Sequence, residues 1–194
     1  LNHSEDPVGF CSLAAALLKN EYSRFVFELP YWKTLVESKS FDQIYHEHVS
    51  YLTIRNSVEM LTRAGLEVLK VELNDYHGGS LRVVSGLKST HKPALDRELL
   101  RQEDERALTS RDTYKDLSSY IQTKKLKVLN YIINQKLQGR KIICVGAAAK
   151  ANTLLTYYSL TPDLILGITD TSQHKIGKYT PLTRLPIYND NYIS

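Results

Sequence analysis

The sequence predicts a mixed α/β protein in which the end of one sheet-containing domain is followed by helices and then by a second, βαβ unit. Three observations support this fold class. Helical and strand patterns alternate over residues 1–88, a polar pattern of helical period fills residues 89–138, and a strand, a glycine turn and a helix open residues 139–194. Strands that alternate with helices are typical of sheets with parallel neighbours.

The first segment carries clear start and stop signals. Acidic residues before Pro7 begin a helix, and Gly65 ends another. The predicted elements are a helix over 7–19, a strand over 24–30, a short helix over 31–38, a helix that ends at Gly65, and strands over 67–73 and 81–87. A glycine turn joins the last two strands, so we expect the last one to form an antiparallel edge of a doubly wound sheet.

The remaining segments differ in polarity. Residues 92–138 predict two helices that bend near Ser110, with charges on a solvated face. The predicted elements after Gly139 are a strand over 140–145, a turn at Gly146, a helix to about Tyr158, a strand over 164–169 and a short strand over 185–188. Because only two or three parallel strands are predicted there, we expect truncation at the carboxyl end.

Composition narrows the function classes. The hydrophobic fraction of 42% supports a folded core, and no run approaches the roughly 18 apolar residues of a membrane span, so we expect a soluble, cytoplasmic protein without a membrane partner. The net charge of +4 is spread along the chain, which favours phosphorylated small molecules over nucleic acid. Met60 is the single methionine, so we expect a piece of a longer protein.

Titratable residues gather in "FDQIYHEHVSYL", residues 41–52. A neutral imidazole beside a carboxylate and a tyrosine suits abstraction of a proton next to a carbonyl, which makes Tyr45, Glu47 and His48 candidates for acid–base chemistry. A buried, hydrogen-bonded histidine explains the pattern equally well. The spacing of His46 and His48 matches neither an HExxH helix nor a zinc finger, so we expect no metal here.

The turn at Gly146 precedes small alanines and a helix, whose free N–H groups favour a phosphate. Asp170 ends the following strand, where dinucleotide folds place a carboxylate for ribose hydroxyls. The residues that we assign to such a ligand are Lys150, Asn152, Asp170, Lys175 and Tyr179. The alternative is that the small residues only permit close packing of helix and sheet.

The hairpin "YHGGSLR" holds two glycines, Gly78 and Gly79, flanked by His77, Ser80 and Arg82. Glycines allow a backbone to approach a ligand closely, and the flanking polar groups suit substrate binding. An ordinary turn is the alternative interpretation.

These motifs together resemble the sugar C-methyltransferases that use S-adenosylmethionine (SAM) to methylate a carbon of a nucleotide-linked keto sugar in deoxysugar biosynthesis. The matching stretches are Asn2 and His3 before Asp6 and Pro7, then "FELP", "FDQIYHEHVSY", "HGGSLR", "GAAAKANTLL" and "DTSQHKIGKYTP". Their order and spacing match over nearly the whole chain. Two positions depart from the family pattern, since Ala151 and Leu182 stand where glycines are usual.

The resemblance implies a division of the chain. Residues 1–88 would be the end of a Rossmann-like SAM methyltransferase domain, residues 89–138 a helical connection, and residues 139–194 a truncated, Rossmann-like substrate-binding domain. The family's zinc module and main SAM-binding residues would lie outside this chain. A partner that supplies this missing half, and self-association, both stay open.

The resemblance also implies residue roles. His48 would remove the proton beside the keto group, Glu47 would orient His48, and Tyr45 would position the sugar or stabilise the enolate. His3 would contribute to the same pocket, and a nucleotide-diphosphate sugar would be the ligand. Two alternatives stay open: a non-catalytic sugar-nucleotide-binding module from a split or decayed gene, and a Rossmann-like NAD-dependent oxidoreductase built around Gly146 and Asp170.

Overall fold

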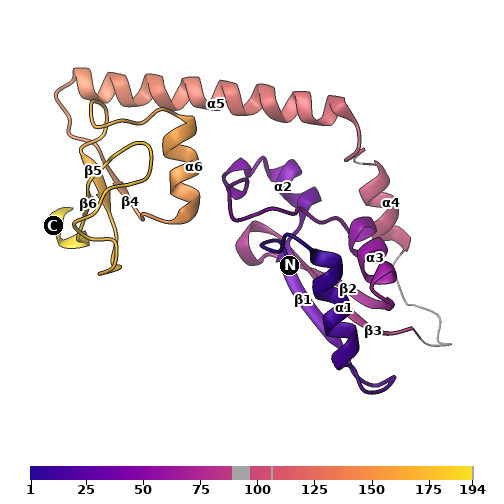
Figure 1. Ribbon diagram of the computed structural model, residues 1–194. Helices are drawn as coiled ribbons and strands as arrows, with labels where there is room; N and C mark the ends of the chain where they lie inside the picture. Colours follow the sequence, from indigo (N-terminus) through magenta and orange to yellow (C-terminus); the bar gives the residue numbers. More distant parts are fainter. Residues whose placement is uncertain (89–96, 106, 194) are drawn as a thin grey trace. The chain divides into compact units, whose positions relative to one another are not determined.

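The computed structural model describes residues 1–88, 97–105 and 107–193. Its internal contacts divide the chain into two compact units, which we describe one at a time (Figure 1). The first unit comprises Leu1–Phe41 with His46–Leu117, and the second comprises Asp42–Tyr45 with Ser118 and the residues that follow it. The three-part division of the sequence stays a prediction.

The elements of the chain alternate between helix and strand, as the sequence predicts. In the first unit they are α1 (Pro7–Leu17), β1 (Phe25–Pro30), α2 (Trp32–Ser38), α3 (Ile54–Arg63), β2 (Leu66–Asn74), η2 (Tyr76–Gly78), β3 (Ser80–Leu87) and α4 (Arg97–Glu105). Helix α5 (Arg111–Leu137) begins in the first unit and continues into the second. The second unit adds β4 (Ile143–Val145), α6 (Ala149–Tyr157), β5 (Gly167–Thr169), β6 (Ile187–Tyr188) and η3 (Asp190–Ile193), and the 3₁₀ turn η1 (Phe41–Gln43) spans the division.

The sheet of the first unit has the order β1-β3-β2, and both outer strands run antiparallel to β3. The prediction that the last strand forms an antiparallel edge is therefore wrong, because β3 inserts between β1 and β2. The burial of β3 agrees with its central position in the sheet. Leu81 and Val83, two residues apart on one face of the strand, are fully buried.

Helices α1 and α3 cover one face of this sheet (Figure 1). Cys11 of α1 and Leu61 of α3 share a buried cluster with sheet residues such as Val83. Both helices begin at side-chain caps: Asp6 accepts a hydrogen bond from the Gly9 N–H at 2.8 Å, and Thr53 caps α3 in the same way. The capping oxygens satisfy N–H groups that the first helical turn leaves without partners.

Helix α4 contacts the start of α3 through the carboxylate of Glu103, a residue with only 4% of its surface exposed. Its Oε2 accepts hydrogen bonds from the Tyr31 hydroxyl and the Ile54 N–H, both at 2.7 Å, and its Oε1 accepts one from the Arg55 N–H at 3.0 Å. Glu103 therefore acts as a remote cap for α3 and favours it through the helix dipole. Burial, followed by this hydrogen bond, raises the pKa of Tyr31 well above its usual range.

The two helices predicted over 92–138 are confirmed as α4 and α5. A turn separates them, in which the Ser110 N–H donates to the Ala107 carbonyl at 2.8 Å. The part of that prediction over 92–96 lies outside the described residues. Helix α5 ends with Gly139 at φ +75° and with the Arg140 N–H bound to the Gln135 carbonyl. Residue 140 thus completes the helix end and does not begin the next strand.

The sheet of the second unit has the order β4-β5-β6 with parallel neighbours, which confirms the predicted βαβ unit. Its strands are shorter than predicted: the register begins with Ile143 opposite Gly167 and ends with Thr169 opposite Tyr188. Buried residues include Leu155 of α6 and Ile168 of β5. The chain is thus a mixed α/β protein, and the Rossmann-like assignment of its units stays a prediction.

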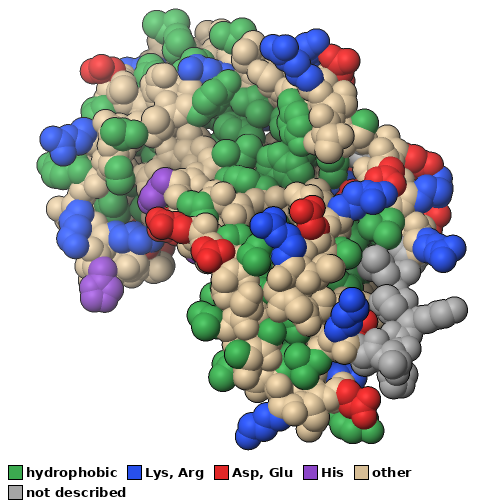
Figure 2. All heavy atoms as spheres, turned by 45° about the vertical axis from the view of Figure 1, so that its right-hand side comes forward, with side chains coloured by type: hydrophobic (Ala, Val, Ile, Leu, Met, Phe, Trp, Pro, Cys, Tyr) green, Lys and Arg blue, Asp and Glu red, His purple; other side chains and the backbone are tan. Residues whose placement is uncertain are grey.

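Two surface properties follow from this arrangement. Among the described residues, every helix is too short or too polar to cross a membrane. Acidic and basic side chains are interspersed with apolar ones over the face that Figure 2 presents, so the scatter of charge predicted from the sequence is visible there.

Replacing Glu103 by alanine is expected to lower the unfolding free energy of the first unit by about 2–4 kcal/mol, because three donors, two of them in buried hydrogen bonds, lose a charged acceptor. Urea denaturation followed by fluorescence of Trp32, the single tryptophan, measures this loss. Glu105→Gln on the exposed side of α4 is the matched control and should change stability by less than about 0.5 kcal/mol. Equal stability of both variants would contradict the capping role.

Candidate functional site

The 41–52 stretch lies against the first residues of the chain. The Asn2 carbonyl accepts hydrogen bonds from the N–H groups of Val49 at 2.8 Å and Ser50 at 3.2 Å. This pairing brings the His3 ring to 5.0 Å from the His48 ring, in an edge-to-face arrangement of 77°. His48 is half-buried and His3 is exposed. The structure thus joins two histidines that are far apart in the sequence.

Further aromatic rings continue from His48 into the first unit. The Tyr51 ring lies 6.2 Å from the His48 ring and 4.8 Å from the Trp32 ring. Trp32 donates from Nε1 to the Tyr114 hydroxyl at 2.9 Å. Sequence reasoning missed Trp32 and Tyr114 as site residues, because they come from different helices and share no motif with residues 41–52.

The other two acid–base candidates lie in different surroundings. The Glu47 carboxylate is 3.9 Å from Nε2 of His46, and both side chains are largely exposed. Tyr45 belongs to the segment Asp42–Tyr45, which groups with the second unit. The geometry of the first unit therefore places Glu47 and His48 on one loop, and the shared role of Tyr45 stays a prediction.

The two glycines of the hairpin are required for different structural reasons. Gly79 has φ +122°, and a Cβ atom built on it would lie 2.3 Å from Cγ2 of Thr34 in α2. Its carbonyl accepts the Tyr31 N–H at 3.0 Å. Gly78 has φ +84° but nothing within 4 Å of such a Cβ atom. Close packing against α2 therefore requires glycine at position 79, whereas position 78 requires only a left-handed backbone.

The polar residues of the hairpin make internal contacts. Ser80 is buried and donates from its hydroxyl to the Tyr76 carbonyl at 2.9 Å. The ring of His77, which has φ +53°, lies 4.1 Å from the Tyr76 ring. The hydroxyl of Ser80 and the ring of His77 therefore both contact other residues of the same turn.

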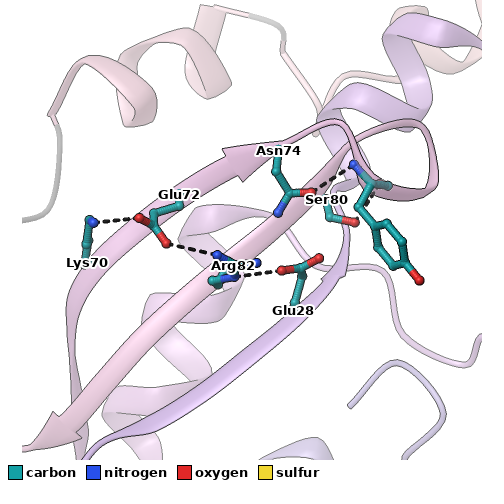
Figure 3. Close-up of polar contacts among 7 residues, drawn as sticks. Glu28, Lys70, Glu72, Asn74, Ser80 and Arg82 are labelled. Carbon is teal, nitrogen blue, oxygen red and sulfur yellow. Dashed lines mark hydrogen bonds and ion pairs between the residues drawn. The ribbon is translucent and has the colours of Figure 1, made fainter.

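Arg82 lies between two carboxylates on the exposed face of the sheet (Figure 3). Its Nε donates to Glu28 of β1 at 2.7 Å, and its guanidinium is 3.5 Å from Glu72 of β2. Lys70 approaches Glu72 from the other side at 2.6 Å and, with Arg82, lowers the pKa of Glu72. Two cations and two anions balance in this ladder, so an anionic ligand at Arg82 would compete with Glu28.

In the second unit, Asp170 ties the two loops that follow β4 and β5. Its Oδ2 accepts from the Ala147 N–H at 2.8 Å and from Nζ of Lys175 at 3.2 Å, and its Oδ1 accepts from the Ser172 N–H at 2.8 Å. Lys175 also donates to the Ala147 carbonyl at 2.9 Å. The Ser172 N–H foremost, then Lys175 and Ala147, hold the pKa of Asp170 below its usual value.

A cavity of about 290 Å³ opens above this clamp, at the carboxyl end of β4 and the start of α6. Of the residues assigned from the sequence, Asn152, Lys175 and Tyr179 line it, together with His174 and Lys178. Lys150 lies in α6 outside the lining, and His174 was missed because a lone histidine in a loop gives no signal. Ala148, at the helix start, provides no side-chain cap. The lysines and uncapped N–H groups suit an anionic ligand.

The two departures from the family pattern have different structural settings. Ala151 lies in the first turn of α6, where alanine is the most favourable residue. Leu182 has φ +60° beside the cavity residue Pro181, a left-handed backbone that glycine adopts with less strain. Ala151 is thus compatible with its helix, whereas Leu182 adopts a left-handed backbone conformation that is strained for a residue other than glycine.

Within the part of the chain that the structure describes, no group of three or more His, Cys, Asp or Glu side chains is placed to hold a metal ion.

Comparisons with known proteins agree with these motifs. Residues 75–194, more than half of the chain, match the family described as C-methyltransferase C-terminal domain. The chain is also similar to the C-methyltransferase NovU of Streptomyces niveus, with 28% identity over 168 residues. That alignment covers 85% of this chain and 40% of NovU, so the chain spans less than half the length of this relative.

Gly79→Ala is expected to destabilise the first unit by about 2–5 kcal/mol, since a left-handed backbone and an overlap with Thr34 both oppose a Cβ atom. Gly78→Ala, its matched control, should cost about 1–2 kcal/mol from the backbone alone. Urea denaturation read from Trp32 compares the two. Adding Thr34→Ala should restore part of the loss at position 79, and equal losses at both glycines would contradict the close approach.

Stability of the second unit is expected to fall in acid because the pKa of Asp170 is lowered on folding. The ionised carboxylate contributes its full stabilisation of the folded unit above the ordinary aspartate pKa of about 3.9. This stabilisation is lost as the pH falls from there through the folded-state pKa. Thermal unfolding followed by circular dichroism between pH 6 and pH 2 should show that the melting temperature of Asp170→Asn falls less on acidification than that of the wild type. Asp163→Asn, at an exposed position, should follow the wild type.

Proposed function

Because the chain belongs to the C-methyltransferase C-terminal domain family, we propose that it is part of a SAM-dependent C-methyltransferase acting on a nucleotide-linked keto-deoxysugar. The name of NovU, a C-methyltransferase, supports the reaction class. The observation that carries the proposal for this chain is the pairing of His3 with His48, held by the Asn2 carbonyl.

His48 is the base in this proposal. Its imidazole takes the proton from the carbon beside the keto group, and the electron pair of that C–H bond passes into an enolate. The exposed imidazole of His3 lies 5.0 Å from the half-buried imidazole of His48, on which the charge develops. In this proposal Glu47, on the same loop, orients His48.

SAM supplies an electrophilic methyl group on a sulfonium when it is bound. The cavity at α6 does not suit SAM, because it is lined by Lys178, whose positive charge disfavours a cationic ligand. We therefore assign no residue of the second unit to SAM. Lys178 instead suits the diphosphate of a sugar nucleotide, and this is the role that we propose for the second unit.

One observation favours a second candidate, a sugar-nucleotide-binding module without chemistry of its own. The cavity at α6 is formed by residues of the second unit alone, so ligand binding there does not require residues 46–52. Calorimetric titration of the chain with SAM and with a thymidine-diphosphate sugar separates binding from catalysis. Asp170 disfavours an NAD-dependent oxidoreductase, because both of its oxygens already accept hydrogen bonds from Ala147, Ser172 and Lys175.

His48→Ala in the full-length protein is expected to slow methyl transfer by about 10²–10⁴-fold, the usual contribution of a general base, with sugar-nucleotide binding nearly unchanged. Two readouts are needed: methyl transfer, and deuterium uptake from D₂O at the carbon beside the keto group. Both should fall together, since both require removal of the same proton.

His46→Ala is the matched control, because His46 lies in the same loop with 85% of its side chain exposed. His46→Ala should retain most of the methyl-transfer activity. The activity of His3→Ala should lie between those of His46→Ala and His48→Ala. Unchanged deuterium uptake in His48→Ala would remove His48 as the base.

A further inference from the structure

A second cavity, of about 230 Å³, lies in the first unit next to Tyr51. Three aromatic rings line it, those of Trp32, Tyr51 and Tyr114, and each is only partly buried. The rest of the lining comes from the start of α3, the end of α4 and the turn before α5. Partly exposed aromatic rings around a concave site are typical of ligand pockets.

Directed hydrogen bonds hold two of these rings in place. The Trp32 Nε1–H donates to the Tyr114 hydroxyl at 2.9 Å, and that hydroxyl donates to the Leu108 carbonyl at 2.6 Å. The Tyr51 ring lies 4.8 Å from the Trp32 ring at 52°. Because the rings are oriented before any ligand arrives, a flat ligand would bind with little loss of side-chain freedom.

The charges in the cavity argue against a phosphate. Arg55 is paired with Asp104, with Nε 2.6 Å from Oδ1, and the buried Glu103 adds a second carboxylate. One cation against two anions suits an uncharged ligand. Asn56 also lines the cavity, and its amide offers a donor and an acceptor to the edge of a heterocycle.

We infer that this aromatic cavity binds the heteroaromatic base of a nucleotide. The inference deepens the proposed function and rests on it for the nucleotide nature of the ligand. The Tyr51 ring lies 6.2 Å from the His48 ring at 73°, which places the cavity beside the proposed base. A base could come from the sugar nucleotide or from the adenosine of SAM, and the chemistry of recognition is common to both.

The probe is the fluorescence of Trp32, the single tryptophan of the 194-residue chain. We expect thymidine diphosphate to quench it saturably, because a stacked base lies against the indole. Inorganic pyrophosphate tests the phosphate part alone and should leave the emission unchanged. S-adenosylhomocysteine distinguishes the second source: if it quenches and thymidine diphosphate does not, the base pocket stands and adenosine fills it.

Tyr114→Leu should weaken binding of the quenching nucleotide by about 5- to 150-fold, the range for loss of one stacking ring. Asn56→Ala, at an exposed position of α3, provides a second variant that leaves the packed rings intact, and it should weaken binding as well. Tyr131→Leu is the matched control, because Tyr131 is exposed on the same helix as Tyr114 and outside the cavity. It should bind like the wild type.

The inference and the proposed function fail separately. Calorimetric binding of thymidine diphosphate without any change in Trp32 emission, at equal affinity in Tyr114→Leu and Asn56→Ala, would overturn the base pocket and leave the methyltransferase proposal intact. Quenching by pyrophosphate alone would also overturn it. Loss of deuterium uptake in His48→Ala tests the proposed function without reference to this cavity.

Discussion

The buried carboxylate of Glu103 is the interaction on which the first unit depends. It binds the Tyr31 hydroxyl and the first N–H groups of α3, and so connects the end of β1, the start of α3 and α4. The Tyr31 position then sets Trp32, whose N–H donates to the Leu52 carbonyl at 3.2 Å. The aromatic cavity is thus built beside a buried carboxylate whose hydrogen bonds come from the protein and not from solvent.

Asp170 performs a related task in the second unit. It binds backbone and lysine donors from the loops after β4 and β5, and so positions Ala147 and Lys175, which line the cavity at α6. A carboxylate that is satisfied in this way stabilises a loop and leaves its neighbours to meet a ligand. Lys178 and His174 line the cavity without belonging to that clamp.

Prediction from the sequence succeeded where local signals decide structure. The start of α1 at Pro7, the end of α3 before Gly65 and the βαβ unit follow from caps, glycines and hydrophobic period. It failed at β3, because pairing order depends on contacts between strands that local periodicity does not encode. It also overextended the strand before Gly146, since residue 140 completes the end of α5.

For this protein the sequence by itself determined the elements, the family and the motif that contains His48, because motifs and periodicity are properties of neighbouring residues. Only the tertiary structure decided that the His3 and His48 rings meet edge to face, that Arg82 is held between Glu28 and Glu72, and that Trp32, Tyr51 and Tyr114 share one cavity. These are contacts between residues distant in the chain, and their geometry is set by packing and backbone hydrogen bonds that no local pattern specifies.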